Sequence, residues 1–227
     1  MVKSKQQKYL ELVEKRKQCG LCEGLINPSR YGNGYLDSQQ IGPWSRWQGN
    51  LESKLMLIGQ DWGTVGYFEK WRGLDQPQGN PTNDNLIELL LSIGIRIDNP
   101  GIDQKGEVFF TNAVLCLKEG NLQSPIKPEW VRNCGERFLK PLIEVVHPKV
   151  VVALGEKAFK AIAKGYNFQI KWSRYKELVE AGSIALQEGI SLFPVYHCGA
   201  RIINTHRNKK AQLKDWERLI LTGCSKG

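Results

Sequence analysis

Three polar side chains lie at the ends of apolar runs, where they could act together on one ligand. Asp61 follows the run from Leu55 to Ile58, Asn112 lies in Phe-Phe-Thr-Asn-Ala, and His197 ends Ser-Leu-Phe-Pro-Val-Tyr-His. A carboxylate can hold a water molecule or stabilise a developing cation, and a histidine can stabilise a developing oxyanion. An amide offers both a donor and an acceptor, so it can read an amide-like ligand edge. Each residue also has a structural interpretation: a solvated loop carboxylate, a turn cap and an interior histidine.

Four of the six cysteines form a second candidate site. Cys19 and Cys22 are separated by two residues, whereas Cys116 follows a predicted strand and Cys134 lies in a predicted helix. Stable disulfides are not expected in a cytosolic chain, which favours metal ligation. Four thiolates gathered from three segments suit tetrahedral zinc or a 4Fe-4S cluster. Structural zinc more often uses two close pairs, so the single pair here favours the cluster.

Apolar runs alternate with helical patterns along the chain. We predict strands at 54–59, 106–113, 149–155 and 191–197, and helices at 3–17, 82–93, 127–146, 156–164, 171–181 and 208–221. Pro194 predicts an edge position for the last strand. Residues 23–53 and 64–82 are interpreted as irregular connections. This alternation predicts βαβ units and a mostly parallel sheet with helices on both faces, so the three polar residues would meet at the carboxyl edge.

Composition limits the class of protein and its partners. The 227 residues carry 32 basic and 23 acidic side chains, a net charge of +9 that is compatible with a nucleic-acid partner. Basic residues concentrate at 3–17 and 201–214. No apolar run is long enough for a membrane span, and the basic N-terminus lacks the apolar core of a secretory signal. We therefore expect a cytoplasmic monomer without membrane contact, folded as one domain over residues 1–227.

Taken in order, these residues resemble the uracil-DNA glycosylase superfamily, in particular its family-4-like iron–sulfur branch. The resemblance covers most of the chain, from the first cysteine to the last helix. It depends on the ordered motifs Cys19-Gly-Leu-Cys22, Gly59-Gln-Asp-Trp-Gly63, Phe110-Thr-Asn-Ala-Val-Leu-Cys116, Cys134, Val151-Val-Ala-Leu-Gly155 and Tyr196-His197. The ordered set is specific, although each piece alone is not.

The resemblance implies a three-layer α/β/α sandwich around a four-stranded, mostly parallel sheet. It also implies an enzyme of base excision repair, which flips a deaminated base out of DNA and hydrolyses its N-glycosidic bond. In such an enzyme the 59–63 loop would activate water through Asp61. Asn112 would bond the edge of uracil, and His197 would stabilise negative charge on the leaving base.

The resemblance further implies contacts to substrate, DNA and cofactor. Besides Asn112, the residues around the base would be Gly59, Gln60, Gly63 and one stacking aromatic, either Phe68 or Trp71. Cations can bind the DNA backbone without reading sequence, and the candidates are Lys118, Arg201, Arg207 and Lys209. A structural 4Fe-4S cluster would be held by Cys19, Cys22, Cys116 and Cys134.

Several residues depart from the family pattern. Trp62 replaces the usual proline of the first motif, and Gln60 stands where the family-4 branch commonly has Glu, while Asp61 matches the acid of the family-1 pattern. The final motif continues as Cys198-Gly199 instead of Pro-Ser. Gly63 stands where family-1 enzymes carry a thymine-excluding tyrosine, which predicts a wider substrate range. The departures also leave open a second hypothesis, a nucleic-acid-binding protein that has lost turnover, and zinc remains the alternative to the cluster.

Overall fold

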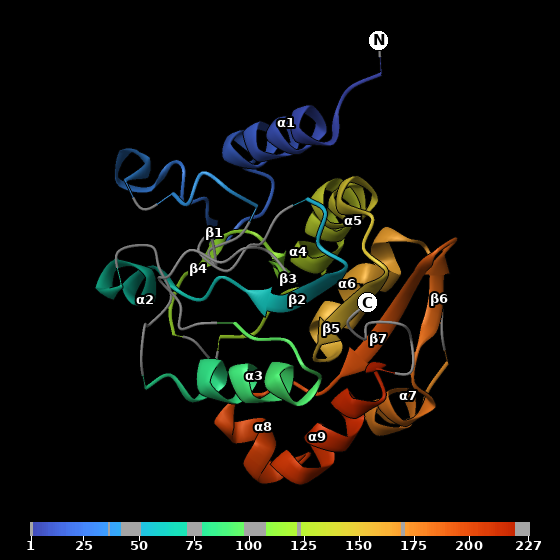
Figure 1. The fold of residues 1–227 in the computed structure, drawn as a ribbon. Helices are drawn as coiled ribbons and strands as arrows, with labels where there is room; N and C mark the ends of the chain where they lie inside the picture. Colours follow the sequence, from blue (N-terminus) through green and yellow to red (C-terminus); the bar gives the residue numbers. More distant parts are fainter. Residues whose placement is uncertain are drawn as a thin grey trace.

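The computed structural model describes residues 2–35, 37–41, 51–71, 79–97, 108–121, 124–168 and 171–220. Its centre is a five-stranded sheet with the order β3-β2-β5-β7-β6 (Figure 1). The strands are β2 (Leu55–Asp61), β3 (Val108–Val114), β5 (Val150–Leu154), β6 (Ile184–Gln187) and β7 (Ile190–Val195). Strands β2, β3, β5 and β7 pair in parallel, and β6 is antiparallel to β7. The predicted α/β/α sandwich around a mostly parallel sheet is confirmed.

The sheet has one strand more than predicted. β6 is only four residues long and none of them is fully buried, so its short Ile-Ala-Leu run was not assigned to a strand. Gly189, with φ of 75°, lies in the short turn that joins β6 to β7. β7 is therefore not the edge strand that Pro194 predicted. However, β6 pairs only with residues 190–192 of β7, so Pro194 lies outside this ladder and its missing N–H leaves no gap there.

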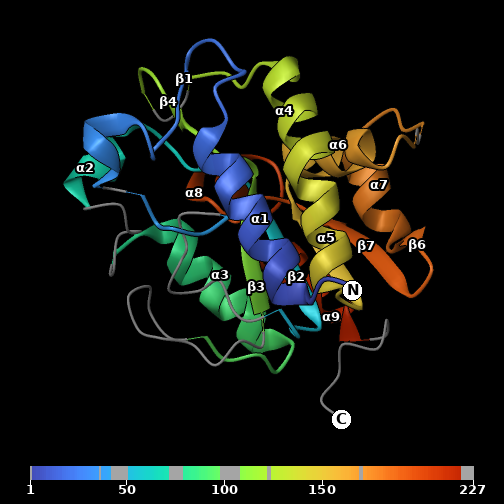
Figure 2. The same cartoon turned by 90° about the horizontal axis from the view of Figure 1, so that it is seen from above.

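Helices cover both faces of the sheet (Figures 1 and 2). One face packs against α1 (Lys5–Gln18), α4 (Pro128–Cys134), α5 (Lys140–Val146) and α6 (Glu156–Gly165), and the other against α3 (Pro81–Ser92) and α9 (Lys209–Glu217). Successive side chains of a strand point to opposite faces. In β2, for example, Met56 and Ile58 enter the first core, while Leu55 and Leu57 enter the second. The same alternation decides on which face each functional residue lies.

The helix predicted over 127–146 is interrupted by a π-helical turn, Gly135–Leu139, between α4 and α5. Pro141 lies at the start of α5, and a proline inside a continuous α-helix would remove one backbone hydrogen bond and clash with the preceding turn. The wider π turn before α5 accommodates the proline ring and its missing N–H. Gly135 also packs so closely on α6 that an added Cβ would lie 2.6 Å from the Ala161 carbonyl oxygen.

Two short helices were not predicted. α2 (Val65–Lys70) begins at Thr64, whose Oγ1 accepts a hydrogen bond from the Tyr67 N–H, and α8 (Ala200–Thr205) follows β7. The sequence of α2 contains glycine, a β-branched residue and two aromatics, which are weak helix formers, so burial of Phe68 decides its structure. α7 (Tyr175–Ala181) matches the end of the predicted 171–181 helix. Among the described helices, none combines the length and apolar character that crossing a bilayer requires.

The described part of the predicted 23–53 connection is anchored to the domain, and residues 42–50 lie outside the described ranges. β1 (Leu25–Ile26) pairs antiparallel with β4 (Leu117–Lys118), and a short 3-10 turn covers Tyr31–Gly34. A buried ion pair joins Arg16 Nη2 to Asp37 Oδ1 at 2.6 Å. The Asn27 amide donates to the carbonyls of Arg16 and Cys19, at 2.8 and 2.7 Å. These contacts hold the first cysteine pair next to the sheet.

Candidate active site and cysteine cavity

Asp61, Asn112 and His197 lie at or just beyond the carboxyl ends of three parallel strands, β2, β3 and β7, of which β2 and β7 are separated by β5. In β3, Val108 and Phe110 enter the core beneath α3 and α9, so Asn112 points to the same side. The same count along β2, from Leu55 and Leu57, assigns Asp61 to this side. His197 lies two residues beyond the end of β7, so this count does not extend to it. The Asp61 carboxylate is near enough to His197 to act on its ionisation. The topology thus brings the three residues to one edge of the sheet.

Asn112 is buried with its amide unpaired. Its exposed fraction is 1%, and neither Oδ1 nor Nδ2 has a hydrogen-bond partner among the described residues. Its register partner on β2 is Gly59, which carries no side chain that could satisfy the amide. A buried polar group without a partner costs about 1–3 kcal/mol, and such a cost is expected where a ligand supplies the missing partners. The interpretation of Asn112 as a turn cap does not fit, because its side chain makes no capping hydrogen bond.

Asp61 is fixed by three groups at the end of β2. Its Oδ1 accepts the Gly63 N–H at 2.7 Å, and its Oδ2 accepts the Gln60 side-chain amide at 2.8 Å. The Lys118 ammonium lies 3.5 Å from Oδ2, and both side chains of this ion pair are buried. Asp61 is therefore not a solvated loop carboxylate. Its position is set by the loop itself and by a cation from β4.

His197 is held in one tautomer. The Gly199 N–H donates to His197 Nδ1 at 2.9 Å, so Nδ1 is the acceptor and the proton of the neutral ring is on Nε2. Burial lowers the pKa of His197 below its ordinary value of 6.5, and the nearby Asp61 carboxylate opposes this shift only in part. At neutral pH the ring is therefore uncharged. It presents an N–H donor that can stabilise an oxyanion.

Residues from three other segments position the His197 loop. Gly155 ends one of the motifs of the family resemblance, whereas the sequence did not point to the other two. Gly155 has φ of 95°, and a Cβ there would lie 3.4 Å from the His197 Cβ. From α3, the Asn85 amide donates to the Cys198 carbonyl at 2.9 Å. From α9, the Gln212 amide donates to the His197 carbonyl at 3.3 Å. The loop is thus tied to the helices that cover the same face of the sheet.

We expect Gly63→Ala to damage the site more than the fold. Gly63 has φ of 95°, which costs an L-residue about 1–2 kcal/mol, and its N–H positions Asp61 Oδ1. A displaced carboxylate should reduce kcat for the base release that the family resemblance implies, by roughly 10- to 100-fold. Gly66→Ala is the matched control, because Gly66 lies in α2 with open space around its Cβ position and alanine should stabilise the helix. Urea unfolding and turnover of both variants measure the two effects, and wild-type kcat in Gly63→Ala would contradict the assignment.

The two candidate stacking aromatics differ in exposure. Phe68 is buried in α2 against Trp62, with ring centroids 5.4 Å apart, whereas Trp71 follows α2 and is half-buried. Trp62, which replaces the proline of the family pattern, is a core residue with 3% of its surface exposed. The substitution is therefore accommodated by packing between α2 and β4.

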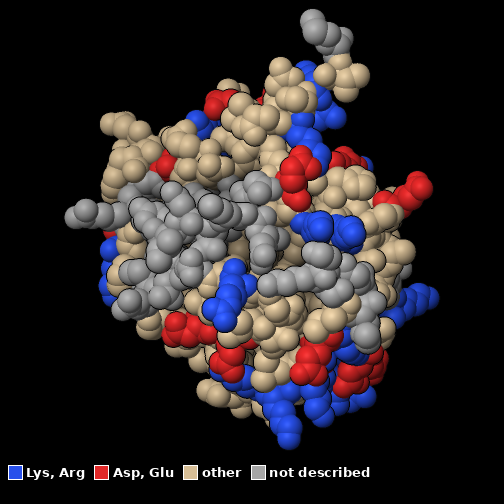
Figure 3. All heavy atoms as spheres, in the orientation of Figure 1, with Lys and Arg blue, Asp and Glu red and all other residues tan. Residues whose placement is uncertain are grey.

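The predicted DNA-contacting cations do not form one open surface. The prediction that Lys118 contacts DNA from the surface is wrong, because its side chain is only 1% exposed and lies beside Asp61. Arg207 forms hydrogen bonds to both carboxylate oxygens of Asp215 at 2.9 and 2.7 Å, and Lys209 is paired with Glu88. Arg201 is exposed in α8. Figure 3 shows basic side chains at the lower rim, over α8 and α9, interspersed with acidic ones.

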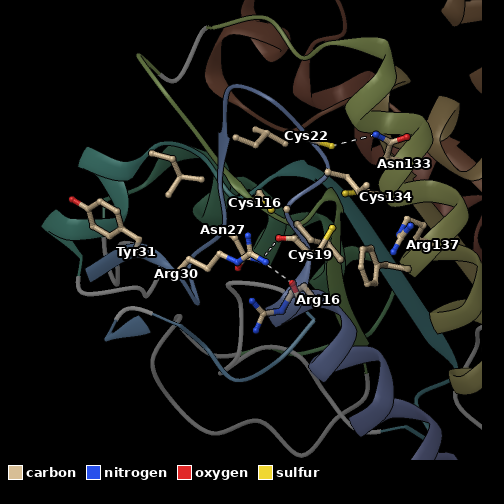
Figure 4. Close-up of a pocket in the computed structure, with 16 residues that line it drawn as sticks. Arg16, Cys19, Cys22, Asn27, Arg30, Tyr31, Cys116, Asn133, Cys134 and Arg137 are labelled. Carbon is tan, nitrogen blue, oxygen red and sulfur yellow. Dashed lines mark hydrogen bonds between the residues drawn. The ribbon is translucent and has the colours of Figure 1, made fainter. Parts of the chain in front are cut away.

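The four predicted metal-ligating cysteines line a single cavity of about 320 Å³ (Figure 4). Cys19 and Cys22 come from the segment after α1, Cys116 from the end of β3, and Cys134 from α4. Basic side chains share the lining, namely Arg16, Arg30 and Arg137, and the Asn133 amide donates to Cys22 Sγ at 3.4 Å. These four residues were not predicted, since nothing in the local sequence links them to the cysteines.

Three of the cavity thiols, those of Cys22, Cys116 and Cys134, would resist ionisation without a cation. Burial, together with the neighbouring thiols, raises the pKa of Cys116 and of Cys22, and burial raises that of Cys134 to about 12. Within the described ranges, no group of three or more Cys, His, Asp or Glu side chains is placed so that it could hold a metal ion. The arrangement is a gathering of four sulfurs around a common space.

The chain is similar in sequence to known proteins. A model of the uracil DNA glycosylase superfamily matches residues 47–220, a range that includes the three strand-end residues but not Cys19 and Cys22. The chain is 25% identical over 210 residues to a type-5 uracil-DNA glycosylase of Pyrobaculum aerophilum, covering 88% of this chain and 86% of that protein. It is 25% identical over 221 residues to a type-4 uracil-DNA glycosylase of Thermotoga maritima, covering 97% and 93%.

Proposed function

The chain belongs to the uracil DNA glycosylase superfamily, and from this we propose that it hydrolyses the N-glycosidic bond of uracil or a related deaminated base in DNA. The single observation that carries this proposal is Asn112. Within the described part of the chain, its buried amide has an unused donor and an unused acceptor at the carboxyl edge of the sheet. The edge of uracil carries the complementary N–H and carbonyl groups, so a flipped base would satisfy both.

The two groups beside Asn112 answer the charges that bond cleavage creates. Rupture of the bond leaves positive charge on the sugar and negative charge on the base. Asp61 supplies a carboxylate that can stabilise the sugar and orient the attacking water. His197 supplies an Nε2–H that can donate to the base oxygen as it becomes negative. Both interactions strengthen as the transition state forms, which is the condition for catalysis.

Base flipping and DNA contact are assigned to the surroundings of this site. We propose that Phe68 or Trp71 stacks on the extruded base, which would offset part of the few kcal/mol that unstacking costs. Gly59 and Gly63 allow close approach of the backbone, and the Gln60 side chain lies at the same edge. Among the predicted cations, Arg201 is the one whose exposure best suits a phosphate contact.

We propose that the cysteine cavity holds a 4Fe-4S cluster in a structural role. The donor set fits, because four thiols surround one space that has room for a group much larger than one metal ion. A cluster ligated by thiolates is anionic, and Arg16 and Arg137 line the same cavity. The group would supply only cross-links between the N-terminal segment and the sheet. Broad visible absorption with bound iron would support the cluster, whereas a colourless protein with bound zinc would support the alternative.

The pKa of His197 predicts how activity depends on pH. Because the folded protein lowers this pKa below 6.5, the neutral ring persists down to mildly acidic pH. We expect kcat/KM to stay level through neutral pH and to fall only below about 6.5. His197→Gln keeps an N–H donor but does not titrate, so it should lack this acid limb. An acid limb that begins above pH 6.5 in the wild type would contradict the assignment.

The proposed function is tested by base release. The protein is incubated with single- and double-stranded oligonucleotides that contain uracil, hypoxanthine or xanthine, and alkali then cleaves the abasic sites. We expect strand breaks for at least one base with the wild type and roughly 10³-fold fewer with Asp61→Asn. No breaks above the Asp61→Asn level for any base would falsify the proposal.

One observation favours the second hypothesis, a superfamily member that binds DNA without turnover. Both oxygens of Asp61 are already bonded within the protein, to Gly63 and Gln60, and Lys118 lies close to one of them. Tight, salt-dependent DNA binding without base release would support this hypothesis, and robust turnover would exclude it.

A further inference from the structure

We propose that Lys118 is a positioning residue for Asp61: with Gln60 it occupies Oδ2, so that Oδ1 is the atom that holds the attacking water. This inference rests on the proposed function. Lys118 was predicted to contact the DNA backbone, but in the structure its side chain is buried inside the protein.

Lys118 fixes the 59–63 loop at two points. Its backbone N–H donates to the Gly63 carbonyl at 2.8 Å, so the main chain of β4 is attached to the loop. Its ammonium lies 3.5 Å from Asp61 Oδ2 and donates to the Ser124 carbonyl at 3.2 Å. β4 is itself paired with β1 through Leu25 and Lys118. The backbone that carries the Lys118 side chain is therefore held both by the 59–63 loop and by β1.

The contacts of Asp61 divide its two oxygens into different roles. Oδ2 accepts the Gln60 amide at 2.8 Å and faces the Lys118 ammonium, whereas Oδ1 accepts the Gly63 N–H at 2.7 Å. A carboxylate oxygen can accept two hydrogen bonds. Among the described residues, each oxygen accepts one hydrogen bond, but the remaining side of Oδ2 faces the Lys118 ammonium, whereas no cation is paired with Oδ1. A water bound to Asp61 would therefore sit on Oδ1.

Removal of Lys118 should change the cleavage rate in opposite directions, depending on whether the residue acts through its charge or by positioning Asp61. A cation near the reaction site disfavours the positive charge that develops on the sugar, so its removal would accelerate cleavage if charge were its main contribution. A buried lysine that fixes the carboxylate should instead be required, because a displacement of about 1 Å can cost roughly 100-fold in rate. The direction of the change in kcat distinguishes the two roles.

The test compares kcat and KM for uracil release from single-stranded DNA by the wild type, Lys118→Met, Lys118→Arg and Gln60→Met. We expect Lys118→Met to lose roughly 100-fold in kcat with KM within about threefold of wild type, and Lys118→Arg to recover part of the loss. Lys149→Met is the matched control, since Lys149 is exposed at the amino end of β5. Circular dichroism melting verifies that each variant is folded.

Each outcome decides the inference. Wild-type or higher kcat in folded Lys118→Met overturns it while leaving the proposed function intact. If the wild type itself releases no base, the proposed function fails and the inference fails with it. If Lys118→Met does not fold, Gln60→Met carries the test, because Gln60 is half-buried and bonds the same oxygen. A roughly 10-fold loss in its kcat supports the inference, and an unchanged kcat overturns it.

Discussion

Replacing Asn112 with leucine should abolish base release and at the same time leave the protein more stable. The Asn112 amide is buried and unpaired among the described residues, so the folded protein bears its desolvation without compensation. An apolar side chain of similar outline removes that penalty, and the free energy of unfolding should rise by about 1 kcal/mol. Without the amide, the base edge loses both partners, and kcat/KM should fall by roughly 10³-fold or more.

Thr111→Val is the matched control for this prediction. Thr111 is the neighbouring residue, equally buried, but its hydroxyl donates to the Ile41 carbonyl at 2.6 Å and it points to the opposite face. Valine there should lower the free energy of unfolding by about 1 kcal/mol and leave turnover unchanged. Urea unfolding and steady-state kinetics separate the two substitutions. Near-wild-type turnover in Asn112→Leu would show that the amide does not read the base.

Replacing Cys116 with alanine should remove the cofactor and loosen the N-terminal segment. Cys116 is close enough to the other three cysteines for each of them to affect its ionisation, so it occupies a central place in the set. Its loss should eliminate visible absorption and bound iron. Because the cluster would link the segment after α1 to β3 and α4, the melting temperature should fall by about 10 °C or more.

Cys198→Ala provides the control for the cysteine prediction. Cys198 is fully buried, like Cys134, but it lies beside His197 and does not line the cysteine cavity. Alanine there should retain the absorption and the bound iron. Limited proteolysis gives a second readout, since residues 19–35 should become susceptible only in Cys116→Ala. Equal iron content in the two variants would contradict the proposed ligand set.

The parallel strands and their polar ends could be predicted because local sequence determines them. Four buried runs rich in Val, Ile, Leu and Phe mark the strands, and a parallel sheet brings their carboxyl ends to one edge. Alternation then directs Asp61 and Asn112 to the same face. The gathering of the four cysteines could be predicted in part for the same reason, since Cys116 follows a strand of the sheet and Cys134 lies in the helix that packs on it.

The supports of the site could not be predicted because they arise from contacts between distant segments. Lys118 has the sequence context of a surface cation, and only the pairing of β1 with β4 shows that it is buried beside Asp61. Asn85 and Gln212 hold the His197 loop from two helices far apart in the sequence. α2 forms although four of its six residues are weak helix formers, because Phe68 is buried. Local patterns carry no signal for such contacts.

The most direct test of the central claim is a crystal structure with DNA that contains a 2′-fluorinated deoxyuridine, whose fluorine disfavours positive charge on the sugar and so prevents cleavage. We expect a base flipped out of the helix, with Asn112 Nδ2 and Oδ1 both hydrogen-bonded to its edge. His197 Nε2 should lie next to a base oxygen and Asp61 beneath the sugar. A base bound elsewhere, with the Asn112 amide still unpaired, would contradict it.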